Sequence, residues 1–366
     1  SESMSGLRSF WRTPPVRTWV CNLRQGPTAH RHQFQNLFLQ MPDHDFFELE
    51  LPESEYEGKT SISHDQNVVI LGANGSGKSR LGAWFERDST QKDKVHRISA
   101  QKSLVMPESV QPKSLEEAEK QLLFGWDDID LDEGGPDYLA NQREVRRWNR
   151  NPVIQSLNDF QELMVYLFSE EFEESTQYRQ EAKKEEEVSD PPTTKLDTVK
   201  RLWEGIFPHR RLDSGSGKIN VYPPEDPDAS YNAREMSDGE RVAFYLIGEC
   251  MAAPTEGIIV IDEPEIHLHR SIQSDLWDAV EQERDDCQFI YLTHDLDFAS
   301  SREATRIWLK DYDGSSWDWR IVDEQEGIPE EVLLSILGSR RSILFVEGDH
   351  GSLDYHIYDR IYPEHT

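Results

Sequence analysis

The feature that most constrains this chain is one short segment, GANGSGKS at residues 72–79, which fits the pattern G-x-x-x-x-G-K-[ST]. It lies between an apolar run (67–72) and a segment with helical character (81–87), the context of a phosphate-binding loop. Glycines there let backbone N–H groups face phosphate oxygens, a lysine adds positive charge, and a serine hydroxyl can bind Mg²⁺. The predicted nucleotide-binding residues of this loop are Gly72, Asn74, Gly75, Ser76, Gly77, Lys78, Ser79 and Arg80.

A second apolar run, GIIVID at residues 257–262, ends in two adjacent carboxylates, Asp262 and Glu263. Ligands of parallel α/β sheets bind at the carboxyl ends of the strands, so both side chains are expected beside the loop. We expect Asp262 to join Ser79 as a Mg²⁺ ligand. Glu263 is placed to orient or deprotonate an attacking water.

A third apolar run, residues 288–293, ends directly before His294. A lone histidine at a strand end is usually structural. Its place about 30 residues after the acidic pair favours instead a role at the transferred phosphate. Glu263, His294 and Lys78 are therefore the predicted catalytic residues.

The segment MSDGER (236–241) precedes a strongly apolar helix, and two interpretations of it remain open. Ser237 followed by Glu240 is typical of a capping box, which exists only to start a helix. A helix start containing serine and glycine can also bind an anion.

Apolar strand-like and helical segments alternate along the chain, which predicts an α/β fold with a parallel or mixed sheet and helices on both faces. A compact helical insertion is expected at about 107–230, since no sustained heptads indicate a coiled coil. Residues 306–323 are typical of a hairpin around Asp313-Gly314. We expect one nucleotide-binding domain at 1–330 and a small C-terminal β-α appendage at 331–366.

The net charge of −31 argues against nonspecific binding of nucleic acid over the whole surface. No stretch approaches the length of a membrane span, and the first residues lack the apolar core of a signal peptide. The three cysteines, Cys21, Cys250 and Cys287, show no metal-like spacing. We therefore expect a cytoplasmic protein without a membrane partner.

The order of these motifs resembles that of ABC-type ATPases, and GANGSGKS, MSDGER, IIVIDEPEIHLH and YLTHD are similar to the branch containing SMC-like and OLD-type proteins. The resemblance implies an ABC-type P-loop ATPase head with ATP and Mg²⁺ as cofactors. It implies that Ser237 and Gly239 cap the γ-phosphate bound by a second subunit, in a homo-oligomer. It also places Gln101 at the Q-loop, where it would contact nucleotide and metal. Residues 265–269 fall at the D-loop position but do not match the transporter form.

The end of the chain carries a second resemblance. ILFVEGD at residues 343–349 is similar to the opening strand and Glu-Gly of a Toprim nuclease fold, here Glu347 and Gly348. No later Asp-x-Asp follows, so a complete nuclease centre in this chain is not expected. ATPases of this branch followed by such a segment occur in bacterial anti-phage systems of the PARIS and OLD types. The resemblance implies a nuclease effector and a phage-encoded trigger as partners.

Two alternatives stay open at this point. One is a repair-type ATPase that touches DNA directly, through the basic segments 143–150 and 199–211 with Trp148 and Trp203 for stacking. These segments are more simply interpreted as helix faces paired with the acidic excess. The other alternative is a scaffold with slow hydrolysis.

Overall fold

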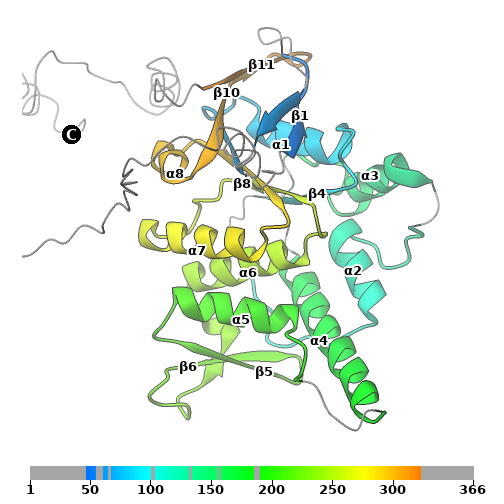
Figure 1. The fold of residues 1–366 in the computed structure, drawn as a ribbon, viewed down its shortest axis with the longest axis vertical. Coiled ribbons are helices and arrows are strands. Elements are labelled where there is room, and N and C mark those ends of the chain that lie inside the picture. Colours follow the sequence, from blue (N-terminus) through cyan, green and yellow to red (C-terminus); the bar gives the residue numbers. More distant parts are fainter. Residues whose placement is uncertain are drawn as a thin grey trace, which may run out of the picture. The chain divides into compact units, whose positions relative to one another are not determined.

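The computed structural model describes residues 47–54, 61–64, 67–99, 104–131, 134–153, 155, 157, 159–184 and 190–322. Its centre is a mixed sheet with helices on both faces, so the predicted α/β class is confirmed (Figure 1). The predicted appendage at 331–366, including the Toprim-like segment, and residues 1–46 lie outside these residues.

Six strands form the central sheet in the order β11-β10-β3-β9-β8-β4. Their bounds are β3 Asn67–Leu71, β4 Val95–Ile98, β8 Ile258–Asp262, β9 Gln288–Thr293, β10 Ala304–Tyr312 and β11 Trp317–Ile321. Neighbouring strands from β10 to β4 pair in parallel, and β11 returns antiparallel along β10. The β10–β11 pair confirms the predicted hairpin.

Strands β3, β8 and β9 are mostly apolar because both faces of the sheet are covered. In β3, for example, Val68 and Ile70 pack into one apolar cluster, whereas Val69 and Leu71 pack into another on the opposite face. On the first face lie α1 (Lys78–Arg87) and the small antiparallel pair β1 (Phe47–Glu50) and β2 (Ser61–His64).

The opposite face carries most of the helices. The larger cluster contains buried side chains of α6 (Asp238–Ala252), α7 (Arg270–Glu283) and α8 (Leu296–Ser301). Helix α5 (Lys195–Ile206) packs on both α6 and α7, and Figure 1 shows these three helices as neighbouring layers.

The described residues of the segment predicted as a helical insertion form four helices. They are α2 Leu115–Phe124, α3 Gly135–Arg146, α4 Phe160–Ala182 and α5 Lys195–Ile206. The structure adds a small antiparallel sheet that the sequence analysis did not predict, formed by β5 (Arg211–Gly215), β6 (Lys218–Tyr222) and β7 (Tyr231–Asn232). A 3₁₀ turn at Ala233–Glu235 then leads into α6. The buried side chains of α4 and α5 share the core cluster of α6, so this segment and the sheet have one continuous core.

The two basic segments considered for DNA contact are largely engaged by carboxylates. Arg147 is buried and lies 3.1 Å from Asp159 and 3.4 Å from Glu249, while Arg201, Arg210 and Arg211 each pair with a glutamate. Trp148 and Trp203 are 1% and 0% exposed, which leaves no ring face for a nucleobase. The DNA-stacking interpretation of these tryptophans was therefore wrong.

Helix α4 is the longest helix of the described part, and its buried positions all lie in its first half. Its second half is rich in charged residues and is half-buried or exposed. Among the described helices none combines the length and the apolar character that crossing a bilayer demands.

Candidate active site

The phosphate-binding loop joins β3 to α1 and begins the site. Gly75 and Gly77 have φ of +91° and +100°, the left-handed region that glycine adopts without strain. Gly77 is the N-cap of α1, so the loop presents the free N–H groups of a helix start. A side chain at Gly77 would also meet Tyr312, because its Cβ would lie 2.9 Å from that of the tyrosine.

Lys78 is the first residue of α1 and is only 6% exposed. Its ammonium donates to the carbonyl oxygens of Gly72 (2.9 Å) and Ala73 (3.2 Å) and lies 3.8 Å from Glu263 Oε1. The loop and its surroundings enclose a pocket of about 330 Å³. The pocket is lined by Asn74, Gly75, Gly77, Lys78, Ser79, Arg80, Val153 and Glu263.

The carboxylates of the second motif reach this pocket because β8 and β3 both pair with β9, and the parallel strands end side by side. Asp262 is buried at the end of β8 and accepts a hydrogen bond from the Ser79 side chain. Burial raises the pKa of Asp262 above its ordinary value, while the Ser79 hydrogen bond and the charge of Arg97 act in the opposite direction. Two of the three predicted metal ligands are thus in contact.

Glu263 turns back from the strand end toward the loop. Its φ is +56°, a left-handed conformation that is uncommon for a residue other than glycine and is found most often at functional sites. Glu263 N donates to Leu292 O (2.8 Å), which ties this turn to β9. One carboxylate oxygen faces Lys78 and the other lies 2.6 Å from His294 Nδ1. The structure therefore brings the three predicted catalytic residues, Lys78, Glu263 and His294, into one continuous set of contacts.

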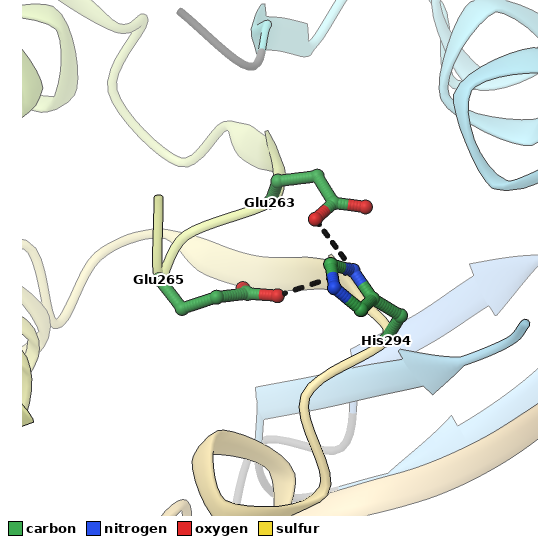
Figure 2. Close-up of side chains that lie close together, drawn as sticks. All are labelled: Glu263, Glu265 and His294. Carbon is green, nitrogen blue, oxygen red and sulfur yellow. Dashed lines mark ion pairs between the residues drawn. The ribbon is translucent and has the colours of Figure 1, made fainter. Parts of the chain in front are cut away.

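A further carboxylate, Glu265, belongs to the same cluster and was not predicted as a site residue. Figure 2 shows Glu263 and Glu265 on two sides of the His294 ring, with Glu265 Oε1 3.5 Å from Nδ1. The side chain of Glu265 is 8% exposed, and burial raises its pKa to about 7. Its sequence signals are its place two residues after Glu263 and at the start of the segment that falls at the D-loop position.

Arg97 also supports the loop from a distance in sequence. It lies within the buried strand β4, donates to the backbone oxygen of Ser79 (3.2 Å), and its guanidinium lies 3.9 Å from the centre of the Trp148 ring. Arg97 also donates to the carbonyl of Pro152, next to Val153 of the pocket. The sequence signal for Arg97 was an arginine inside a buried strand. Its partners Trp148 and Pro152 lie in the insertion, so the sequence could not identify them.

The start of α6 lies apart from the pocket lining. Ser237 accepts from Glu240 N (3.4 Å), and Glu240 Oε2 accepts from Ser237 N (2.8 Å) and Oγ (2.7 Å), so the predicted capping box is confirmed. Ser237 is exposed and Gly239 is half-buried. Neither residue lines the pocket of its own chain, and their role toward a second subunit stays a prediction. Gln101 lies outside the described residues.

Residues 225–300 match the model of a family described as "AAA domain, putative AbiEii toxin, Type IV TA system". This region includes Ser237, Asp262, Glu263 and His294 but not the phosphate-binding loop. Among curated proteins, none matches the chain significantly in sequence.

Several solved structures are similar at low sequence identity. The SMC head bound to the C-winged helix domain of ScpA has 16% identity and a TM-score of 0.42, covering 77% of this chain and 98% of its own. The SMC head domain from Thermotoga maritima has 14% identity and a TM-score of 0.38, with coverages of 76% and 99%. A nucleotide-free ATP-binding cassette of an ABC transporter has 17% identity and a TM-score of 0.34, with coverages of 80% and 95%.

Proposed function

We propose that this protein is an ABC-type ATPase that hydrolyses ATP in the presence of Mg²⁺. The observation that carries the proposal is the convergence of three separate motifs at one edge of the sheet. Lys78, Glu263 and His294 form a continuous chain of contacts there, at 3.8 Å and 2.6 Å, beside a glycine-rich helix start. This combination of anion-binding backbone, ammonium, carboxylate and imidazole suits phosphoryl transfer to water.

Each residue has a distinct task in this proposal. The N–H groups of the loop and Lys78 bind the phosphates, so Lys78 exchanges its carbonyl contacts at Gly72 and Ala73 for phosphate oxygens. Glu263 orients a water and accepts its proton. His294 contacts the transferred phosphoryl group and is held in place by the carboxylate beside it.

The residues present also fit a magnesium ion. Mg²⁺ prefers oxygen ligands, commonly one or two from the protein with water and phosphate oxygens completing the shell. Ser79 and Asp262 already contact each other, and Asp262 Oδ1 is buried without a hydrogen-bond partner among the described residues. Ser79 and Asp262 would hold the ion, and Gln101 remains a third proposed ligand. When bound, Mg²⁺ neutralises charge on the phosphate oxygens.

We propose that a second copy of the chain completes the site. The exposed start of α6 would place Ser237 and Gly239 against nucleotide bound by the neighbouring protomer. Support comes from the sequence resemblance and from the separation of these residues from their own pocket. ATP then favours a head-to-head dimer or a larger assembly.

The cellular role that we propose is a switch in bacterial anti-phage defence. ATP-dependent assembly would hold or release a Toprim-type nuclease effector when a phage-encoded trigger arrives. This part rests on the sequence resemblance of the ATPase motifs and of residues 343–349. Direct DNA processing is less favoured, because Trp148 and Trp203 are buried and the nearby arginines pair with carboxylates.

The test measures phosphate release from Mg²⁺-ATP as a function of protein concentration. A site shared by two protomers requires specific activity to rise with concentration and then to level off. Light scattering with the Glu263→Gln variant and ATP should show the assembly directly. Constant specific activity together with a monomeric mass would refute the shared site, and no phosphate release by the wild-type protein would refute the ATPase proposal.

A further inference from the structure

Glu265 is the one carboxylate of the His294 cluster to which the proposed mechanism gives no task. It is almost fully buried, and its Oε2 has no hydrogen-bond partner within the described part of the chain. Removing a carboxylate from water without full compensation is costly, so such a group rarely contributes to stability. Perturbed, buried carboxylates of this kind occur preferentially at functional sites.

The side-chain contacts of Glu265 converge on the end of β9. Thr293 Oγ1 donates to Glu265 Oε1 (2.7 Å) and accepts in turn from Asp295 N (2.9 Å). Glu265 therefore contacts Thr293 directly and Asp295 through the threonine hydroxyl, on both sides of His294. Thr293 is completely buried, so water does not compete for its hydroxyl.

The same carboxylate oxygen also faces the imidazole. Glu263 Oε2 and Glu265 Oε1 lie 2.6 Å and 3.5 Å from the same nitrogen, Nδ1 of His294 (Figure 2). Glu263 sits closer, but the proposed mechanism also gives Glu263 the attacking water, and a carboxylate that turns toward the water loosens its contact with the histidine. When Glu263 moves to the water, Glu265 is the acceptor that remains within reach of Nδ1.

The backbone makes this arrangement possible. Glu263 has left-handed φ, and Ile266 N donates to Glu263 O (3.1 Å), which closes a tight turn over residues 263–266. Gln273 Nε2 of α7 donates to the carbonyl oxygen of Glu265 (3.2 Å) and fixes its main chain. The turn thus places the carboxylates of Glu263 and Glu265 beside the imidazole of His294.

We propose that Glu265 is a positioning residue for hydrolysis, which holds Thr293 and then Nδ1 of His294 while Glu263 engages the water. The imidazole then keeps one orientation throughout the step, with Nε2 free to face the phosphoryl group. This inference rests on the proposed function, because it requires that Glu263 and His294 act in hydrolysis. No proton leaves Glu265, and its effect on the reaction is exerted through His294.

The experiment compares Glu265→Ala and Glu265→Gln with wild type in kcat, KM for ATP and melting temperature. We expect Glu265→Ala to lower kcat by about 10- to 100-fold, the usual effect of losing a group that orients a catalytic side chain. KM should stay within about twofold, since the residue does not touch nucleotide. Glu265→Gln should recover most of kcat, because the amide oxygen can still accept from Thr293 and remains within reach of Nδ1.

Glu281→Gln is the matched control. Glu281 is also a partly buried carboxylate that accepts from a hydroxyl of β9, Tyr291 OH at 2.5 Å, but it has no contact with His294. Its substitution should leave kcat unchanged. If Glu281→Gln lowers kcat as much as Glu265→Ala, the effect is general to the strand and the proposal fails.

Two further outcomes separate this inference from the proposed function. A Glu265→Ala variant with wild-type kcat, beside an inactive Glu263→Gln variant, overturns the positioning role and leaves the ATPase proposal intact. An equal change of kcat and KM, or no recovery by Glu265→Gln at an unchanged melting temperature, also overturns it. Wild-type activity of Glu263→Gln contradicts the proposed function itself, whatever Glu265 does.

Discussion

The phosphate pocket and the start of α6 are both candidate contacts for ATP, but they are built in opposite ways. Lys78 and Asp262 are 6% and 7% exposed and are held by partners from the loop, from α1 and from the turn after β8. Ser237 is exposed, and its side chain is hydrogen-bonded to Glu240, three residues away. The first region is organised by the tertiary fold, whereas the second is a locally capped surface that leaves room for a partner.

The two regions therefore differ in what they need in order to bind nucleotide. A buried ammonium among carbonyl oxygens is ready to receive a polyanion without rearrangement of the chain. An exposed helix start has no ligand of its own chain beyond its cap and acts only when another molecule is placed against it. The predictions below change one region at a time.

Lys78→Ala should have the largest effect on nucleotide binding. The substitution removes the buried positive charge from the loop, so affinity for ATP should fall by at least about 100-fold. Titration of a fluorescent nucleotide measures the change. Lys94→Ala is the control, because Lys94 is an exposed lysine just before β4 and its loss should leave affinity unchanged. Equal affinity of the Lys78 variant and wild type would rule out the phosphate-binding role.

Ser237→Asp should abolish ATP-dependent assembly and hydrolysis while affinity for ATP in the protomer persists. A carboxylate at about 4 Å from a phosphate in a partly desolvated interface costs about 4 kcal/mol at an effective dielectric constant near 20. Ser237→Asn is the matched control, since asparagine is an equally good N-cap without the charge. The Asp variant also places a second carboxylate beside Glu240 of the same protomer. A lower melting temperature would report that local repulsion, whereas loss of assembly at an unchanged melting temperature reports repulsion across the interface.

Mixing experiments sharpen this result. A mixed dimer of Ser237→Asp and Lys78→Ala protomers has one site with both defects and one site with neither. Partial activity should therefore return in the mixture. Full activity of Ser237→Asp by itself would show that the start of α6 is only structural.

Trp148→Leu tests the buried aromatic beside Arg97. Loss of a fully buried tryptophan leaves a cavity and removes its contact with the guanidinium, so the free energy of unfolding should fall by about 2–4 kcal/mol. Affinity for single-stranded DNA should not change. Chemical denaturation measures the free energy of unfolding, and a titration measures the affinity for DNA. Phe172→Leu is the control, because Phe172 is 58% exposed and its substitution should leave no cavity. A selective loss of DNA affinity would revive direct DNA contact.

Glu265→Gln should have the smallest effect, visible in the pH dependence of stability. Burial raises the pKa of Glu265 to about 7 from an ordinary value of 4.5, so the folded protein keeps a proton that the unfolded chain loses. Its contribution to the free energy of unfolding therefore falls as pH rises from about 4.5 to 7. The melting temperature of Glu265→Gln, relative to wild type, should be higher at pH 8 than at pH 5 by about 1–2 °C. Glu256→Gln, at an exposed site, should show no such dependence.

Much of the site could be predicted from sequence because its parts lie in short motifs. Lys78, Asp262, Glu263 and His294 each follow or precede an apolar strand, and parallel pairing alone brings the strand ends together. The same alternation of apolar segments predicted the α/β class. The capping box at Ser237 was also local, and the structure confirms it.

The remainder depends on contacts between distant residues. Glu265 reaches the site through its hydrogen bond with Thr293, twenty-eight positions later, and through the left-handed turn at Glu263. The residue types of that segment do not predict the turn. Arg97 reaches Trp148 and Pro152 of the insertion across the core. The burial of Trp148 and Trp203, and the short strands β5–β7, likewise follow from packing that the sequence pattern does not contain.

The central claim is that Glu263 carries hydrolysis at the phosphate pocket. The most direct test is steady-state phosphate release from Mg²⁺-ATP by Glu263→Gln, measured with ATP affinity in the same preparation. Glu256→Gln is the control, because Glu256 also has left-handed φ (+53°) but precedes β8 instead of following it. We predict that Glu263→Gln binds ATP normally and releases phosphate about 100-fold more slowly, whereas Glu256→Gln matches wild type. Phosphate release by Glu263→Gln at the wild-type rate would contradict the account.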